Sequence, residues 1–359
     1  MKVSIGSRII NGPWGGGNLF VLNLKKFLIQ NGHEVIHDLC AKDIDIILLT
    51  DPRSRKESSS TFNHQDILKY KKNVNPNVTV VQRINECDER KGTDFINKFY
   101  LEASKCADHV IFVSKWLEKI YTDIGMPKNK TSVIMSGADE EVFNKEGLSE
   151  FNRKKIKIVT HHWSAHMNKG FNIYKKLDEL LSKPKYQNLE FSYIGNVPSE
   201  VSFINTEIKT PLSGKALANE IKKNHIYLTA SINEPSGNHH IEAAQCGLPI
   251  LYLNSGGIPE YCNGYGVSFE NNFEESLNQI IDNYSIYKEN LEDYPFSAQA
   301  MCVEFLEKFI NVKSEKLQIE PKINKFIMVL FLFKNNVQKI LTSFTVKQYF
   351  KNLIKRVIQ

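Results

Sequence analysis

The stretch "SINEPSGNHHIEAAQCGLPILYLNSGGIPEY", residues 231 to 261, decides the fold. It reads as a strand end, a polar loop from Glu234, a helix with Glu242 one turn inside, a buried strand and a second glycine loop. In one interpretation this is an ordinary junction, with Ser236 or Asn238 as the helix cap. In the other, the helix N-terminus binds phosphate and the second glutamate holds a sugar hydroxyl.

Outward from this stretch, apolar runs of strand length alternate with amphipathic segments of helix length, which is typical of parallel sheets covered by helices. We predict two Rossmann-like α/β domains that face each other across a cleft, at the carboxyl ends of both sheets. One predicted helix spans residues 16–32 and ends at Gly32. The predicted strands are 2–7, 44–50, 78–84, 109–114 and 131–137 in the first half, and 155–163, 189–195, 225–231 and 249–254 in the second.

The length of 359 residues suits two domains and a short tail. We place the first domain at residues 1–146, the second at 147–312 and the tail at 313–359. The polar stretch 144–155 reads as the linker, and a helix around 297–310 is expected to be the last of the second domain.

Composition and charge exclude several classes of protein. The hydrophobic content of 42% and the charged content of 24% are globular values, not those of disordered or polytopic membrane proteins. Of the net charge of +6, residues 313–359 contribute +8, so the first 312 residues sum to −2. The basic charge belongs to the tail, and we expect no nucleic acid as a partner of the domains.

The six cysteines are scattered without a C-x-x-C pair, which indicates neither a disulfide framework nor a zinc site. The apolar run near the N-terminus is too short for a signal peptide. We therefore expect a cytoplasmic protein, with peripheral attachment at the inner face of the membrane as a further option.

Consecutive glycines follow the first predicted strand, in "GPWGGGN" at residues 12–18. Their backbone N–H groups can approach an anion or a sugar without obstruction by side chains. The spacing is neither G-x-G-x-x-G nor a Walker loop, which argues against a dinucleotide or ATP, and a flexible turn is the alternative.

A second polar segment, "HHWSAHMNKG" at residues 161–170, follows the first strand of the second half. Lys169 lies at the foot of a helix, where it could meet a phosphate as a point charge, and Gly170 lets the backbone turn. The three histidines of this segment do not have the spacing of a known metal site, so we expect no metal.

Together these motifs resemble the retaining GT-B glycosyltransferases of family 4, the group 1 type. The likeness covers about residues 1–312 and implies a GT-B fold, with a nucleoside diphosphate sugar held mainly by the C-terminal domain and an acceptor by the N-terminal one. It rests on the E-x7-E pair Glu234 and Glu242 followed by "EAAQCGLPI", on "GGIPEY", on "KG" at 169–170, on "FVSKWL" at 112–117 and on "GGG" at 15–17.

The resemblance implies a role for each matching residue. Glu242 would accept hydrogen bonds from ribose hydroxyls, Glu234 would orient the donor sugar, and Lys169 would neutralise the diphosphate. Such a site needs no metal or other cofactor, because helix dipoles and a lysine offset the charge on the departing nucleotide. The other implied donor-binding residues are Gly16, Gly17, His162, Ser236, Gly237, Asn238, His239 and Gly257.

The chain departs from the family pattern in two places. The family has an arginine a few residues before the lysine, and residues 161–169 contain none, so His162 or a residue from elsewhere must replace it. Asn238, His239 and His240 stand where the family commonly has Leu-Val-Leu. These polar side chains either contact the donor sugar or cap the helix.

Acceptor-side candidates follow the predicted strand 78–84, where the family often carries a His or Asp close to the acceptor. A charged surface loop is the alternative. The candidates are Arg83, Asn85, Glu86 and Asp88, of which we single out Asn85 and Asp88 as catalytic together with Glu234 and Lys169.

We therefore expect an enzyme that moves a hexose from a nucleoside diphosphate sugar to a hydroxyl of a glycan or glycolipid. A nucleotide-sugar epimerase of GT-B fold is one alternative. A non-catalytic relative that only binds sugar nucleotides or a partner enzyme is another.

The tail combines apolar residues with lysines. Its uninterrupted apolar run, Phe326–Phe333, is eight residues long, short of the ~20 that span a bilayer. Further apolar residues recur near helical spacing from Ile340 to Val357. We expect either a basic amphipathic anchor on anionic lipid, which would suit a lipid-linked acceptor, or helices that pack on the domains or form a dimer contact.

Overall fold

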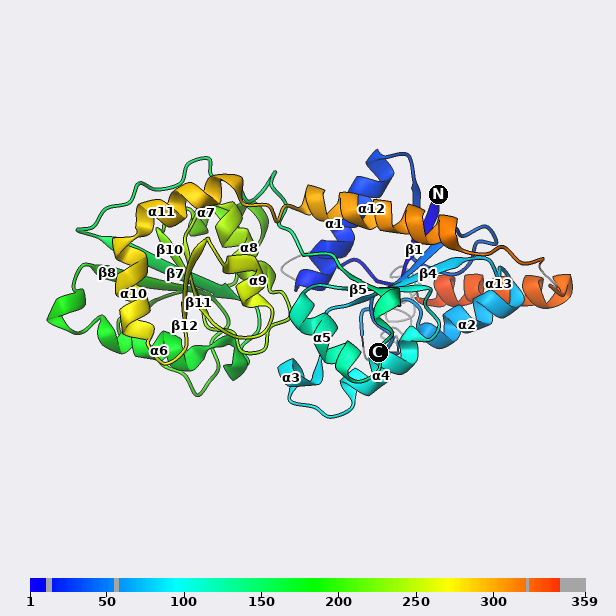
Figure 1. The fold of residues 1–359 in the computed structure, drawn as a ribbon, viewed down its shortest axis with the longest axis horizontal. Coiled ribbons are helices and arrows are strands. Elements are labelled where there is room, and N and C mark those ends of the chain that lie inside the picture. Colours follow the sequence, from blue (N-terminus) through cyan, green and yellow to red (C-terminus); the bar gives the residue numbers. More distant parts are fainter. Residues whose placement is uncertain (11–14, 55–57, 321–322, 343–359) are drawn as a thin grey trace, which may run out of the picture.

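The computed structural model describes residues 1–10, 15–54, 58–320 and 323–342. They form two parallel six-stranded sheets, each covered by helices, which lie side by side along the long axis of the molecule (Figure 1). The strand orders are β2-β1-β3-β4-β5-β6 and β12-β11-β10-β7-β8-β9. The predicted α/β architecture of two Rossmann-like domains is confirmed.

The N-terminal domain contains the first sheet. Its strands are β1 (Lys2–Ile5), β2 (Glu34–Ile36), β3 (Ile46–Leu49), β4 (Thr79–Ile84), β5 (His109–Phe112) and β6 (Thr131–Val133). Its α-helices are α1 (Gly16–Gln30), α2 (His64–Asn73), α3 (Asp88–Lys91), α4 (Ile96–Ser104) and α5 (Lys115–Asp123).

The C-terminal domain contains the second sheet. Its strands are β7 (Ile156–His162), β8 (Leu189–Gly195), β9 (Glu207–Lys209), β10 (Ile226–Thr229), β11 (Ile250–Leu253) and β12 (Gly266–Phe269). Its α-helices are α6 (Phe171–Leu180), α7 (Gly214–Ile221), α8 (Asn238–Gln245), α9 (Ile258–Cys262), α10 (Phe273–Asp282) and α11 (Tyr284–Asn290).

Both faces of the first sheet are buried, and β3 shows how. Ile46 and Leu48 pack with residues of α1 on one face, whereas Ile47 and Leu49 pack with residues of α2 and α5 on the other. Successive side chains of a strand point to opposite faces, so a strand covered on both sides reads as a continuous apolar run.

All nine predicted strands are present. Three further short strands, β2, β9 and β12, were not predicted. Each of the three lies at an edge of its sheet. The side chains of β2 and β9 are half-buried or exposed. The three-residue strands β2 and β9 show neither a buried run nor a clear alternation, and β12 buries Val267 and Phe269 alternately but is only four residues long, which explains the omission.

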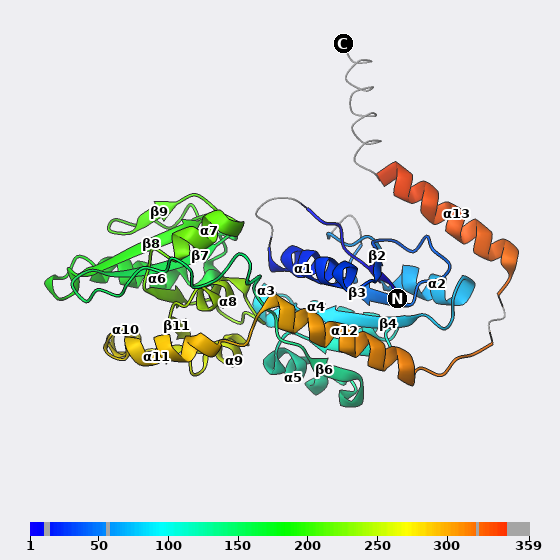
Figure 2. The same ribbon diagram turned by 90° about the horizontal axis from the view of Figure 1, so that it is seen from above.

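Helix α12 (Ala298–Glu315) extends the predicted helix 297–310 and crosses back to the N-terminal domain. The ring centroid of Phe305 in α12 lies 5.0 Å from the ring centroid of Phe20 in α1. Figures 1 and 2 show α12 lying along the N-terminal sheet. The chain therefore passes twice between the domains, and a bridge between Ala138 and Ser297 joins the two crossings.

Helix α13 (Lys325–Thr342) packs on the N-terminal domain beside α2. Met328, Phe331 and Leu332 contact the core there, and Lys339 Nζ lies 2.8 Å from Asp38 Oδ2. None of the described helices is long and apolar enough to cross a membrane. The predicted tail positions beyond Thr342 lie outside the described residues.

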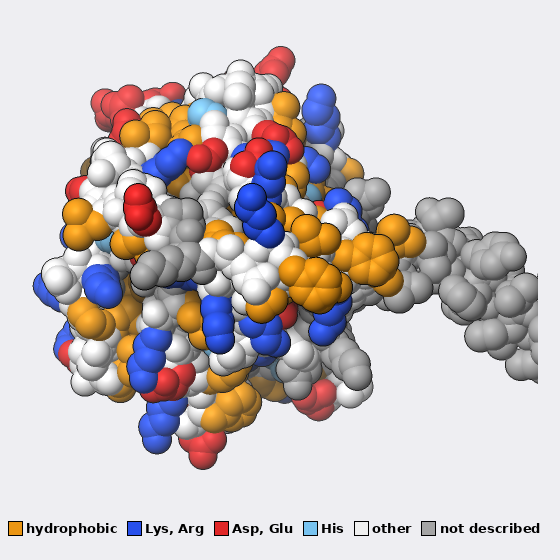
Figure 3. All heavy atoms as spheres, turned by 90° about the vertical axis from the view of Figure 1, so that its right-hand side faces the viewer, with side chains coloured by type: hydrophobic (Ala, Val, Ile, Leu, Met, Phe, Trp, Pro, Cys, Tyr) orange, Lys and Arg blue, Asp and Glu red, His pale blue; other side chains and the backbone are white. Residues whose placement is uncertain are grey.

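The outward side of α13 carries exposed apolar side chains. Figure 3 shows apolar side chains gathered on this end of the molecule, among lysines and arginines. Along α13 the exposed apolar residues are Phe326, Ile327, Val329, Leu330, Phe333, Val337 and Ile340.

Candidate functional site

A cavity of about 720 Å³ lies between the two domains. Residues from both sheets line it, among them Ser7 after β1, Thr50 after β3, Asn85 after β4 and His162 at the end of β7. The carboxyl ends of the strands thus face the cavity, as open α/β sheets place their ligand sites.

Helix α8 begins at this cavity without a side-chain cap. The residue before it, Gly237, has φ 82°, a left-handed conformation that L side chains rarely adopt. A Cβ atom there would lie 2.8 Å from the His239 ring, so the position requires glycine. Neither Ser236 nor Asn238 caps the helix, and the capping interpretation of these two residues is wrong.

The first turn of α1 faces the first turn of α8 across the cavity. A Cβ atom on Gly16 would lie 2.5 Å from Oδ1 of Asn238, so the glycine permits the close approach of the two domains. Gly17 lines the cavity beside it. Two helix N-termini, each with a partial positive charge, therefore meet at one place, a favourable environment for an anion.

Glu234 is buried between two cations. Its Oε2 lies 2.5 Å from Lys169 Nζ, and its Oε1 lies 3.3 Å from Nε of Arg90. Burial alone raises the pKa of the Glu234 carboxyl, but the charges of Arg90 and Lys169 outweigh it and lower the pKa to about 2. The side chain is therefore ionised at neutral pH.

Arg90 comes from α3 in the N-terminal domain. The nearby charge of Glu234 raises its pKa, and so does that of Glu86, whose Oε1 lies 3.0 Å from its Nη1. Asn168 Nδ2 donates to the Arg90 carbonyl at 2.9 Å, and Asn233 Nδ2 donates to the Glu89 carbonyl at 3.1 Å. A cation of the N-terminal domain thus reaches Glu234 of the C-terminal domain.

Glu242, one turn inside α8, is buried and paired with a histidine. Its Oε2 lies 2.9 Å from Nε2 of His161, whose Nδ1 lies 3.2 Å from the Tyr227 hydroxyl. Among the described residues, no hydrogen bond or ion pair is present at the other carboxylate oxygen, Glu242 Oε1. One carboxylate oxygen is thus oriented by the domain, and both Glu242 and His161 line the cavity.

Two histidines of the cavity lining, His162 and His239, are uncharged at neutral pH. His162 Nε2 lies 2.7 Å from the Tyr174 hydroxyl, and His239 Nε2 lies 2.9 Å from Oγ1 of Thr229. Burial lowers the pKa of both rings well below the usual value. These side chains act as neutral hydrogen-bonding groups, and the described residues contain no group of His, Cys, Asp or Glu arranged to hold a metal ion.

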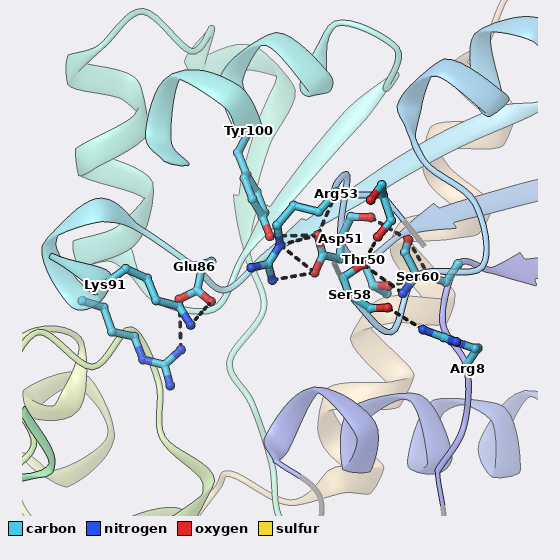
Figure 4. A network of polar contacts seen from close by, with 12 residues as sticks. Arg8, Thr50, Asp51, Arg53, Ser58, Ser60, Glu86, Lys91 and Tyr100 are labelled. Atoms are coloured by element: carbon cyan, nitrogen blue, oxygen red, sulfur yellow. Dashed lines mark hydrogen bonds and ion pairs between the residues drawn. The ribbon is translucent and has the colours of Figure 1, made fainter. Parts of the chain in front are cut away.

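The N-terminal wall of the cavity carries a network of polar contacts, shown in Figure 4. Arg53 and Asp51 form a two-bond ion pair, with Nη2 to Oδ2 at 2.7 Å and Nε to Oδ1 at 3.0 Å. Tyr100 donates to Asp51 Oδ1 at 3.3 Å. Glu86, which also pairs with Lys91 at 3.1 Å, lies on the same wall. The wall offers charged and hydroxyl groups to a polar ligand.

Most of the residues singled out in the sequence meet at this one cavity. Its lining includes Glu234, Lys169, Asn85, Gly16, Gly17, His162, Ser236, Gly237, Asn238, His239 and Glu242.

Asp88 and Gly257, which the sequence also singled out, do not line the cavity. Asp88 accepts from the backbone N–H groups of Ile96 and Asn97 at 2.8 and 3.0 Å, and so orders the start of α4. Gly257 donates its N–H to the Glu234 carbonyl at 2.9 Å. A Cβ there would lie 2.2 Å from the carbonyl oxygen of Pro235, so this glycine serves close packing.

The sequence did not single out Arg90. It lies six residues after the end of the predicted strand and reads as part of a charged loop, so only the fold brings it to Glu234. Glu260 was likewise missed. Its carboxylate crosses between the domains and accepts from the backbone N–H groups of Lys115 and Trp116, at 2.8 and 2.7 Å, at the start of α5.

Comparison of the sequence with known proteins gives two matches. Residues 202–294 match the family described as "Glycosyl transferases group 1". The phosphatidylinositol N-acetylglucosaminyltransferase gpi3 subunit of Schizosaccharomyces pombe is 32% identical over 76 residues, which make up 20% of this chain and 17% of that protein. The chain thus matches less than a fifth of the length of this curated relative.

Solved structures resemble the whole two-domain body. A glycosyltransferase from Rickettsia africae has 17% identity and a TM-score of 0.64, covering 88% of this chain and 99% of its own. HepE from Anabaena, in complex with UDP-glucose, has 12% identity and a TM-score of 0.61, covering 87% and 100%. The pneumococcal O-GlcNAc transferase GtfA, with UDP and GlcNAc, has 12% identity and a TM-score of 0.56, covering 80% and 59%.

At these identities the structural likeness establishes the fold. Residues 202–294 include α8 and its two flanking strands, β10 and β11, with Glu234 and Glu242 between them. This segment matches the group 1 glycosyl transferases. The two facing domains of the chain have the fold of the GT-B glycosyltransferases.

Proposed function

We propose that this protein is a glycosyltransferase that moves a hexose from a nucleoside diphosphate sugar to a hydroxyl of a glycan or glycolipid. One observation carries the proposal: the Lys169–Glu234 pair, the uncapped start of α8 and Glu242 line a single cavity between two domains. Phosphate, ribose and sugar each have a matching group there.

The nucleotide half of the donor fits the C-terminal wall. A nucleoside diphosphate carries vicinal ribose hydroxyls, and Glu242 can accept from them through Oε1 while His161 holds Oε2. The start of α8 and the nearby Lys169 face the diphosphate. HepE was solved with UDP-glucose, and uridine diphosphate sugars are therefore the first donors to test.

The chemistry consists of one bond exchange at the anomeric carbon. The bond from that carbon to the diphosphate oxygen breaks, a bond to the acceptor oxygen forms on the same face of the sugar, and the acceptor hydroxyl passes its proton to the departing diphosphate. Negative charge grows on the departing diphosphate, where the dipoles of α1 and α8 and the charge of Lys169 stabilise it. We propose that no metal is needed and that the anomeric configuration is retained.

The acceptor fits the N-terminal wall. Asn85 and Glu86 line the cavity after β4, and Asp51, Arg53 and Tyr100 continue the polar surface. Carboxylates, guanidinium and hydroxyl groups match the hydroxyls of a sugar, which both donate and accept.

We further propose that the outer face of α13 contacts an anionic membrane at the cytoplasmic side. Seven exposed apolar residues share this helix with three lysines, Lys325, Lys334 and Lys339, and the helix contains no acid. Apolar insertion combined with attraction to acidic lipid is the usual basis of interfacial binding. Such contact would bring the cleft to a lipid-linked acceptor.

Liposome flotation tests the membrane contact. The full chain is expected to float with vesicles that contain phosphatidylserine and to float less with neutral vesicles or in high salt. A variant with Phe326, Leu330 and Phe333 changed to Ser should remain at the bottom. Equal flotation of both proteins, or dimerisation through this face in place of lipid binding, would contradict the proposal.

A panel of nucleotide sugars tests the enzymatic proposal. Thermal shift first finds which nucleotide stabilises the protein, since a ligand that binds only the folded state raises its stability. Product analysis with the donor alone, and then with sugar acceptors, separates the classes. A transferase forms a glycoside only when an acceptor is present, and an epimerase converts the donor in the absence of an acceptor. A binding protein gives no product in either reaction.

A further inference from the structure

Arg83, on β4, is a buried cation for which the structure shows no counterion. Among the described residues, Arg83 and Lys169 are the two buried Lys or Arg side chains, 5% and 9% exposed. Lys169 is paired with Glu234. The Arg83 guanidinium instead packs on the ring of Phe20, with its Cζ 4.1 Å from the ring centroid, and takes part in none of the side-chain hydrogen bonds or ion pairs of the described residues.

An isolated buried charge is costly, because the guanidinium loses its hydration without gaining an anion. Burial lowers the pKa of Arg83 to about 10, and the side chain therefore remains protonated at neutral pH. A charged, desolvated group with no anion beside it is a common feature of functional sites.

Arg83 faces the cavity already described. It belongs to its lining together with Phe20 of α1, Asn85 and Ser136. Helix α1 has no acid in its first turn, so its N-terminal dipole adds to the positive potential there. By contrast, Arg90 already lies against two carboxylates.

We propose that Arg83 is an anion-binding residue of the N-terminal domain and takes a phosphate group of a ligand bound in the cleft. This rests on the proposed function, which supplies two sources of phosphate: the diphosphate of the donor or a phosphate on the acceptor. The guanidinium provides two parallel N–H donors for such a group, with Phe20 holding its plane. Arg83 would thereby do the work of the arginine missing before Lys169, from the opposite domain.

The test compares Arg83→Met with the matched control Arg153→Met. Methionine keeps the length and apolar packing on Phe20 and removes the charge. Arg153 is exposed, does not line the cavity and pairs with Asp282. Calorimetry measures the binding of UDP, of uridine and of inorganic phosphate to each protein. Inorganic phosphate is titrated a second time into each protein saturated with UDP.

If the donor diphosphate is the ligand, Arg83→Met weakens UDP roughly tenfold to a hundredfold and leaves uridine unchanged. If a phosphate on the acceptor is the ligand, UDP affinity is unchanged, and inorganic phosphate binds to the UDP complex of the wild type but not to that of the variant. In both cases the unliganded variant melts at the same temperature as the wild type or higher, because an unpaired buried charge has been removed.

Unchanged binding of UDP and phosphate in Arg83→Met would overturn the proposal. A lower melting temperature of the unliganded variant with unchanged binding would give the side chain a purely structural role and overturn it as well. If the wild type binds no nucleotide but Arg83 still binds inorganic phosphate, the donor assignment fails and the anion site stands.

Discussion

Arg90 of the N-terminal domain and Glu234 of the C-terminal domain lie 3.3 Å apart across the cleft, from Nε to Oε1. On its other side the same carboxylate holds Lys169. The Glu234 carboxylate therefore links the contact between the domains to the position of Lys169, which faces the donor in the proposed function. Donor affinity should depend on a residue that belongs to the acceptor domain.

If the cleft binds a nucleotide sugar as proposed, Arg90→Met should weaken that binding by about tenfold, because it removes the contact between the domains that positions Glu234 and, through Glu234, Lys169. Lys91→Met is the matched control, since Lys91 pairs with Glu86 and not with Glu234. Calorimetry with the stabilising nucleotide measures the difference. Equal affinities of the two variants would show that Arg90 only supports the N-terminal wall.

The ionisation of Glu234 makes the free energy of unfolding depend on pH in the acidic range. Its pKa is about 2 in the folded protein and 4.5 for an ordinary glutamate, so the folded state favours the ionised form. Ionised Glu234 therefore stabilises the fold above about pH 4.5, and this contribution is lost as pH falls toward 2. Urea unfolding at several acid pH values should show a steeper loss for the wild type than for Glu234→Gln. Parallel pH dependences would contradict the ion-pair account.

Glu242→Gln should weaken nucleotide binding by roughly one to two orders of magnitude, because it removes the negative charge that strengthens the hydrogen bonds to the ribose hydroxyls. Deoxyribose nucleotides should show a smaller difference between the two proteins, because one hydroxyl is missing. Glu190→Gln, at an exposed ion pair with Lys155, is the control. Unchanged affinity in Glu242→Gln would assign this glutamate to the fold alone.

Glu260 should affect stability without affecting the donor. Its carboxylate accepts two backbone N–H groups at the start of α5, and loss of such a cap costs about 1 kcal/mol. Glu260→Ala is thus expected to lower the melting temperature by a few degrees and to leave nucleotide affinity unchanged. A large loss of affinity would instead mean that this contact sets the distance between the domains.

The sequence predicts the central strands and the C-terminal half of the cleft well, and particular residues show why. Ile46 to Leu49 are buried on both faces of the sheet, so they appear as an apolar run. Glu234, Gly237 and Glu242 lie close together in the chain, at one loop and one helix start, and local pattern suffices to bring them to one place.

Contacts between distant segments are what the sequence does not reveal. Arg90 and Glu234 are far apart in the chain and meet only because two domains close on each other. Glu260, in a motif that reads as a glycine loop, caps a helix of the other domain. Helix α12 looks like the last helix of the second domain but packs on the first, because its apolar face matches the one that α1 presents.

The account is tested most directly by titration of the full chain with UDP-glucose and UDP-N-acetylglucosamine, compared with GDP-sugars, in wild type and Lys169→Met. We predict that the wild type binds at least one of these donors with an affinity that falls by tenfold or more in the variant, with both proteins folded. A folded wild type that binds none of them, or a donor affinity that Lys169→Met leaves unchanged, would contradict the assignment of this cleft to a nucleotide sugar.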